Sequence, residues 1–216
     1  MYRFVRPICI VLMVLAGYAV QAQNENIPKI ELLEGDLLLQ DLDCGPLCDA
    51  IESVTDGFDS HDFSHIGLVA FKEGTRDVYV IEAVGNNVRL TRMDSFMART
   101  TNKVYIARVN PKYASLIPTA IKFAKMQLGK PYDDEFIYDN DKYYCSELIY
   151  DAFKSANGDK PFFKLEPMTF KSPNSKEYNP AWVKYYSELN MDIPQDKPGI
   201  NPAGISRSDK LVILNR

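Results

Sequence analysis

Residues 143–153 read Tyr-Tyr-Cys-Ser-Glu-Leu-Ile-Tyr-Asp-Ala-Phe, and they place Cys145 at the predicted start of a helix. From there, apolar residues recur at the three- and four-residue spacing of a single helical face: Leu148, Ile149, Ala152, Phe153 and Ala156. Gly158 is the predicted stop. A thiol at a helix N-terminus lies near unpaired backbone N–H groups and the positive end of the helix dipole, which favour the thiolate. The stretch therefore predicts a nucleophilic cysteine.

A thiolate nucleophile needs an imidazole to take its proton. The chain contains two histidines. His65 opens an apolar strand, so a sheet would hold its ring, whereas His61 lies in an acidic loop. We expect His65 to be the base, because catalytic groups need rigid support. The alternative is a histidine that only packs in the core.

A third polar group usually orients the imidazole, and Glu82 is the candidate. It ends the strand that follows His65 along the chain, and antiparallel pairing of the two strands would bring its carboxylate to the ring. A solvated glutamate at a strand end is the alternative. Glu147 is nearer to Cys145 in sequence, but its place in the first helical turn predicts an interaction with the helix dipole.

The rest of the pattern predicts an α+β protein in which an antiparallel meander packs against helices. Alternating or apolar runs bounded by turn signals predict strands at residues 35–40, 64–71, 77–83, 87–91, 103–109 and 210–214. Helical periodicity predicts helices at residues 116–128 and 181–189 besides the one that starts at Cys145. From residue 160 to residue 201 the chain is rich in proline, aromatic and polar residues, which indicates long loops with short helices.

The N-terminus has the pattern of a secretory signal. A basic start with Arg3 and Arg6 precedes an apolar core at residues 8–20 and a small-x-small cleavage site at residues 20–22. We expect residues 1–22 to be removed and residues 23–216 to form one domain that is periplasmic or secreted; a retained anchor is the alternative. Cleavage changes the formal net charge from −4 to −6. This acidic chain without a basic run is expected to bind neither nucleic acid nor, electrostatically, anionic lipid.

Three cysteines remain after the signal, and in an exported protein an odd count indicates one free thiol. Cys44 and Cys48 are separated by three residues. They form either a small disulfide loop, which leaves Cys145 free, or two buried thiols, and spacing alone does not decide between these.

Several motifs together resemble one family. They are Gly35-Asp36, His65-Ile66-Gly67, Ile81-Glu82-Ala83, Leu128-Gly129-Lys130-Pro131-Tyr132 and Tyr144-Cys145-Ser146-Glu147-Leu148. Over about residues 34–153 the chain resembles the YiiX-like enzymes, circularly permuted relatives of the NlpC-type, papain-like cysteine amidases and peptidases. The resemblance implies the permuted papain-like fold and assigns Cys145 as nucleophile, His65 as base and Glu82 as the third member.

Other residues are weaker candidates for the site. The backbone N–H of Cys145 is an expected oxyanion donor. Gln40, at the end of the first strand, is a second donor or only a polar strand-end residue, and Tyr144 lines the substrate pocket or packs beside the helix start. Asp41 opens a segment that would border the cleft, where acids favour a substrate with an amine or are merely solvated.

We therefore expect an exported cysteine hydrolase that cleaves an amide bond in peptides or cell-wall peptides through a thioester acyl-enzyme. The alternatives are a lipid acyltransferase or thioesterase of the lecithin retinol acyltransferase type, and a non-catalytic binding module. No metal-ligand spacing is recognisable around His61 and His65, so no metal and no cofactor are expected. We expect no membrane anchor after signal removal, and the sequence makes no prediction of the oligomeric state.

Overall fold

The computed structural model describes residues 30–216, so the predicted signal peptide and the expected domain start at residue 23 lie outside the described residues. The strands are β1 (Leu37–Gln40), β2 (His65–Phe71), β3 (Val78–Val84), β4 (Asn87–Arg92), β5 (Tyr105–Val109), β6 (Glu166–Pro167), β7 (Pro198–Gly199) and β8 (Leu211–Ile213). The α-helices are α1 (Pro46–Glu52), α2 (Met93–Met97), α3 (Ile117–Met126), α4 (Cys145–Ala156), α5 (Pro180–Glu188) and α6 (Pro202–Ser206). Two 3-10 helices, η1 (Phe58–Ser60) and η2 (Pro111–Leu116), complete the set.

Six strands form one antiparallel sheet in the order β4-β3-β2-β1-β5-β8. The central strands are buried on both faces, which is why β1 and β2 are nearly continuous apolar runs rather than alternating ones. In β1, Leu37 and Leu39 belong to one core cluster and Leu38 belongs to another, because successive side chains point to opposite faces of a strand. The sheet therefore separates two hydrophobic cores.

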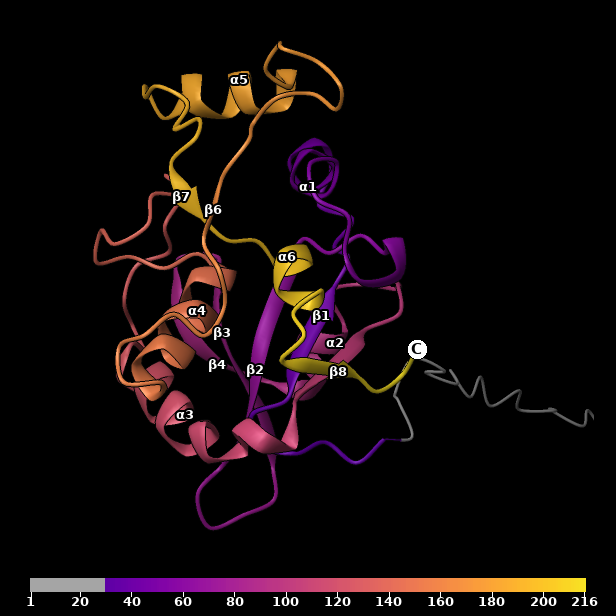
Figure 1. Ribbon diagram of the computed structural model, residues 1–216, viewed down its shortest axis with the longest axis vertical. Helices are drawn as coiled ribbons and strands as arrows, with labels where there is room; N and C mark the ends of the chain where they lie inside the picture. Colours follow the sequence, from indigo (N-terminus) through magenta and orange to yellow (C-terminus); the bar gives the residue numbers. More distant parts are fainter. Residues whose placement is uncertain (1–29) are drawn as a thin grey trace, which may run out of the picture.

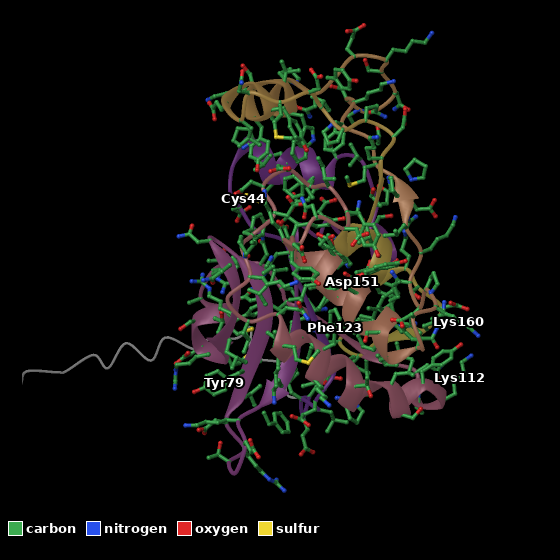
Figure 2. All side chains as sticks on the ribbon, turned by 90° about the vertical axis from the view of Figure 1, so that its left-hand side faces the viewer. Cys44, Tyr79, Lys112, Phe123, Asp151 and Lys160 are labelled. Carbon is green, nitrogen blue, oxygen red and sulfur yellow. A yellow bond between two sulfur atoms is a disulfide. The ribbon has the colours of Figure 1, made fainter. Side chains whose placement is uncertain are left out.

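The larger core lies between the sheet and the helices α3 and α4, which cover one face (Figure 1). Figure 2 shows this layering from the side, with Phe123 of α3 and Asp151 of α4 on the helical side and Tyr79 of β3 on the sheet side. The smaller core lies on the other face, where Phe96 of α2 packs among Val69, Val80 and Ile106 of the sheet. The helix that carries Cys145 thus rests on a rigid sheet.

A third cluster lies at one end of the molecule, where α1 and α5 are drawn together at the top of Figure 1. Its buried members are Ala50 of α1, Phe170, and Trp182 and Tyr186 of α5. Trp182 makes edge-to-face contacts with Phe136 and Phe170, at ring-centroid distances of 5.6 Å and 5.1 Å. Such contacts add to the burial of the rings. This cluster builds a wall above the start of α4.

The long elements and the short strands β1 and β8 agree with the sequence-based predictions, whereas the short helices α1, α2 and α6 were missed. The predicted stop of α4 is confirmed, since Gly158 follows the helix with a positive φ of 67°. The helices α1, α2 and α6 have five to seven residues, too few for a repeated apolar spacing. Within residues 30–216, no helix is both long and apolar enough to cross a membrane.

Candidate active site

Cys145 is the first residue of α4, and it follows Tyr144, whose backbone is extended. Its side chain is buried, and its Sγ lies 3.9 Å from the carbonyl oxygen of Ser64. Ser64 immediately precedes His65 at the start of β2. The thiol at the helix N-terminus and the histidine at the strand start therefore meet at one end of the sheet. Cys145 is also the free cysteine of the described residues.

The carboxylate of Glu82 lies against the ring of His65, with 2.6 Å between Nε2 and Oε2. Both side chains are buried. Gly67 lets β3 and α2 pack closely beside the pair, because a Cβ at Gly67 would lie 2.3 Å from Val80 Cγ1 and 3.1 Å from Phe96 Cε2. With Nε2–H donated to Glu82, Nδ1 is the nitrogen left to exchange a proton with a thiol. The structure thus brings the two predicted residues into the expected contact.

The surroundings favour an ionised His65–Glu82 pair. Burial works against the imidazolium, but contacts with Cys145 and Glu82 outweigh it and raise the pKa of His65 to about 9. Burial would also raise the pKa of Glu82, but hydrogen bonds from Arg99 and then His65 outweigh it and lower that pKa to about 2. Near neutral pH, Glu82 is therefore a carboxylate and His65 carries a proton.

Arg99 is a site residue that the sequence reasoning missed. It lies just after α2, and its guanidinium donates to both oxygens of Glu82, to Oε2 over 2.7 Å and to Oε1. It also lies over the ring of Phe96, 5.3 Å from the ring centroid. The local sequence around Arg99 carries no motif, and its partner Glu82 is 17 residues away on β3. Only the pairing of β2, β3 and the α2 segment reveals the contact.

Gln40 is the expected second oxyanion donor, and in this structure its amide is bonded to the α2 segment. Its side chain is fully buried, and its Nε2 donates to the carbonyl oxygen of Phe96 over 2.9 Å. Gln40 pairs with His65 across β1 and β2, so its side chain emerges on the same face as the imidazole, the face that packs against α2. Gln40 therefore ties α2 to the sheet, and its role as an oxyanion donor stays a prediction.

Tyr144 and Cys145 line a cavity of about 770 Å³. The Tyr144 hydroxyl accepts a hydrogen bond from Ile200 N over 3.2 Å, so the ring is both a packed residue and part of the wall. Aromatic side chains form much of the lining: Tyr132, Phe136, Phe163, Phe170 and Trp182. The volume lies within the range of small-molecule sites, about 300–1,000 Å³. Cys145 thus opens into a pocket large enough for a substrate.

The acids near the site have separate surroundings. Asp41 is not part of the cavity wall; burial and the neighbouring Asp43 raise its pKa, and its carbonyl oxygen accepts from Thr100 over 2.7 Å. Glu147 is fully buried, and its carboxylate accepts from Tyr144 N over 3.4 Å and from Asp139 N over 3.0 Å. Burial raises the pKa of Glu147 to about 8. Glu147 therefore caps the start of α4, in line with its predicted place at the helix terminus.

Cys44 and Cys48 form a disulfide, with their Cα atoms 5.4 Å apart, at the N-terminal end of α1. Figure 2 labels Cys44 beside this helix. The second histidine, His61, has a different partner from the thiol: its Nε2 is hydrogen-bonded to the hydroxyl of Tyr105 over 2.7 Å. Among residues 30–216, no group of three or more histidine, cysteine, aspartate or glutamate side chains could hold a metal ion.

Comparison with known proteins gives three matches. A family model described as a permuted papain-like amidase enzyme, YaeF/YiiX, C92 family, matches residues 31–215. The uncharacterized protein YiiX of Escherichia coli K12 is 27% identical over 157 residues, which cover 71% of this chain and 73% of that protein. A crystal structure described as metalloprotein yiiX from Escherichia coli O157:H7 has a TM-score of 0.70 at 23% identity, covering 87% of this chain and 98% of the other. This last likeness supports the fold.

Proposed function

Because the chain belongs to the permuted papain-like amidase family of YaeF and YiiX, we propose that it hydrolyses an amide bond with Cys145 as the nucleophile. The observation that carries the proposal is the buried line of side chains from the thiol at the start of α4 through His65 to Glu82. A thiol, an imidazole and an orienting carboxylate are the parts that covalent acyl transfer requires. They meet beside a cavity of about 770 Å³.

The first half of the reaction forms a thioester. The Cys145 thiolate attacks the amide carbonyl carbon while His65 holds the proton from the thiol. The oxyanion that develops faces the backbone N–H of Cys145, the first residue of α4, because an N–H in the first turn of a helix has no carbonyl of a preceding turn to bond. His65 then gives its proton to the departing amine, the C–N bond breaks, and the acyl group stays on sulfur.

The second half releases the acid. His65, neutral after the amine leaves, takes a proton from water as the water oxygen attacks the thioester carbon. Collapse of the tetrahedral intermediate breaks the C–S bond, and the imidazolium and thiolate are restored beside Glu82. Throughout, the bond from His65 Nε2 to Glu82 keeps Nδ1 aimed at the reacting atoms.

We propose peptides, including those of the cell wall, as the substrate class. The test is incubation of the purified protein and a Cys145→Ala variant with a mixed muropeptide preparation. The parent is expected to release new amino groups, and rapid quenching should show a peptide acyl adduct on Cys145 by mass spectrometry. Full amide hydrolysis by the variant would rule out Cys145 as nucleophile. A fatty-acyl adduct from a lipid pool would favour acyl transfer instead.

We also propose that the protein is exported and that residues 1–22 are removed as a signal peptide. The Cys44–Cys48 disulfide supports this proposal, because disulfides persist in oxidising compartments. Expression of the full chain in a bacterial host, followed by fractionation and mass determination, should give a periplasmic or secreted species that begins at about Gln23. A cytoplasmic species of full mass would contradict the proposal.

A further inference from the structure

The strongest feature that the proposed reaction leaves unused is the arginine behind the His65–Glu82 pair. We propose that Arg99 is a positioning residue that holds the Cys145–His65 pair in its reactive, ionised form by acting through Glu82. This inference rests on the roles proposed above for Cys145, His65 and Glu82. Arg99 itself touches neither the thiol nor the imidazole in the hydrogen bonds of the described residues, and its contacts are with Glu82 and Phe96.

Arg99 balances the charge of the buried site. A reactive pair of thiolate and imidazolium is neutral as a pair, but Glu82 adds a third charge in a place with no solvent exposure. An uncompensated buried carboxylate beside a thiolate disfavours that thiolate. Arg99 supplies the missing positive charge, so the four groups together carry no net charge. Without Arg99 the buried network would take up a proton more readily.

Arg99 also fixes the orientation of the Glu82 carboxylate. Two N–H groups of the Arg99 guanidinium reach both oxygens of Glu82, which fixes the plane of the carboxylate. Oxygen Oε2 then accepts from Arg99 over 2.7 Å and from His65 over 2.6 Å. A lysine in the same place would supply the charge as a single point but not the planar fork. Arg99 therefore sets where the ring of His65 can bond.

The backbone on both sides of Arg99 is anchored to the end of the sheet that carries His65. Phe96 packs on His65, with ring centroids 5.9 Å apart, and its carbonyl oxygen accepts from Gln40. Thr100, the next residue after Arg99, donates its hydroxyl to the carbonyl oxygen of Asp41. The α2 segment is thus fastened on both sides of Arg99.

Two cations and two phenols complete the titratable surroundings of the pair. Arg99 and His65 face Glu82, while Cys145 and Glu82 face His65. Tyr132 and Tyr144 face Cys145, and burial raises the pKa of each phenol well above its ordinary value, so both are neutral. Arg89 pairs with Glu82 across β3 and β4, but its side chain is exposed and extends toward Gly85, with Nη2 3.6 Å from the position of a Cβ there. Arg99 is therefore the cation whose removal should be felt at the thiol.

The test is the rate at which iodoacetamide alkylates Cys145, measured across pH 3–9, since this readout needs no substrate. We expect Arg99→Gln to move the acid limb of the alkylation profile to a pH higher by about one unit or more. Without the adjacent cation the pKa of Glu82 rises by about 1–3 units, and a protonated Glu82 no longer stabilises the imidazolium that pairs with the thiolate. Arg99→Lys should leave the acid limb near its parent position but lower the plateau rate several-fold. Glu82→Gln combined with Arg99→Gln should show little further shift beyond Glu82→Gln alone.

Arg108→Gln is the matched control. Arg108 also holds a buried carboxylate with two N–H groups, that of Asp36, but it does so between β5 and the start of β1, away from the His65–Glu82 pair. It should lower the thermal midpoint while leaving the alkylation profile unchanged, which separates loss of a buried ion pair from loss of the site.

A profile for Arg99→Gln that superimposes on the parent would overturn the proposal, as would an equal shift in the Glu82→Gln background. Should Arg99→Gln fail to fold, a parent-like plateau in Arg99→Lys decides against the proposal in the same way. Failure of the proposed function looks different, because in that case His65→Ala would alkylate at the parent rate.

Discussion

Two buried carboxylates of the sheet are each bound by an arginine, and only one of them is a candidate for chemistry. Just before β1, Asp36 accepts from Arg108 Nε and Nη2 over 2.7 Å and 2.8 Å. On β3, two strands away in the sheet, Glu82 accepts from Arg99. Both carboxylates are at most 1% exposed, and both arginines keep about a quarter of their side-chain surface in solvent.

The two clamps differ in their third partner. The second oxygen of Asp36 also accepts from the backbone N–H of Leu33 over 2.8 Å, which closes a turn before the strand. The corresponding partner of Glu82 is the ring of His65. A backbone amide does not titrate, whereas an imidazole moves a proton near neutral pH. The same kind of ion pair therefore closes a turn at Asp36, whereas at Glu82 it contacts the histidine to which we assign the proton transfer.

The largest difference between the two carboxylate sites is expected when the imidazole is removed. His65→Ala should slow iodoacetamide alkylation of Cys145 at neutral pH by about 1,000-fold, since general-base groups are worth about 10²–10⁴. Asp36→Asn, in the other arginine–carboxylate pair, should leave the alkylation rate within about two-fold of the parent. Rates are followed by mass spectrometry at pH 7. Equal alkylation in parent and His65→Ala would show that the Glu82 site is no more reactive in character than the Asp36 site.

Removing the structural arginine should affect stability alone. Arg108→Gln leaves Asp36 buried without its cation, and we expect a loss of about 3 kcal/mol in the free energy of unfolding. Urea denaturation followed by circular dichroism measures this loss. Slower alkylation in the folded variant would show that the Arg108–Asp36 pair also acts on the thiol.

Acid should remove the stabilising effect of the Glu82 carboxylate within a narrow pH range. The pKa of Glu82 is lowered to about 2 from its ordinary 4.5, so its ionised form stabilises the fold fully above about pH 4.5 and loses that effect as pH falls toward 2. The stability difference between the parent and Glu82→Gln should therefore shrink by about 2–3 kcal/mol between pH 5 and pH 2.5. Denaturation curves at several pH values test this, and a constant difference would contradict it.

The smallest effect is expected at the disulfide, which lies outside both clamps. Replacing Cys44 and Cys48 by serine frees a short loop at the start of α1, and chain entropy predicts a loss of about 2 kcal/mol. Alkylation of Cys145 should be unchanged, measured with the same reagent on the double variant. A slower rate would show that the disulfide end of α1 also supports the site.

The sequence predicted the elements with long, regular patterns. The strands β1 to β5 and the helices α3, α4 and α5 each match a predicted range within a few residues, because apolar spacing reflects which face of an element is buried. The helix start at Cys145 is confirmed, and the predicted contact between His65 and Glu82 is present at 2.6 Å. The roles of these residues in catalysis stay predictions.

Contacts between segments far apart in the chain could not be predicted from the sequence. Nothing near Arg99 indicates a partner on β3. The sequence also does not show that the register of β1 and β2 directs the Gln40 amide toward Phe96. Such choices depend on which strands pair and on which face a side chain emerges, and a shift of one residue would reverse the face.

Sequence alone thus determined the local features of this protein: a cysteine at a helix start, a histidine at a strand start and the periodicity that places each on a rigid element. The Glu82 partner of the histidine was also predicted, whereas the folded sheet was needed to show that Arg99 binds this carboxylate and that the Gln40 amide bonds to Phe96. The two kinds of contact differ in the sequence distance over which they act. Helix and strand patterns arise from neighbours a few residues apart, whereas the charge balance of the site is set by side chains that only the folded sheet brings together.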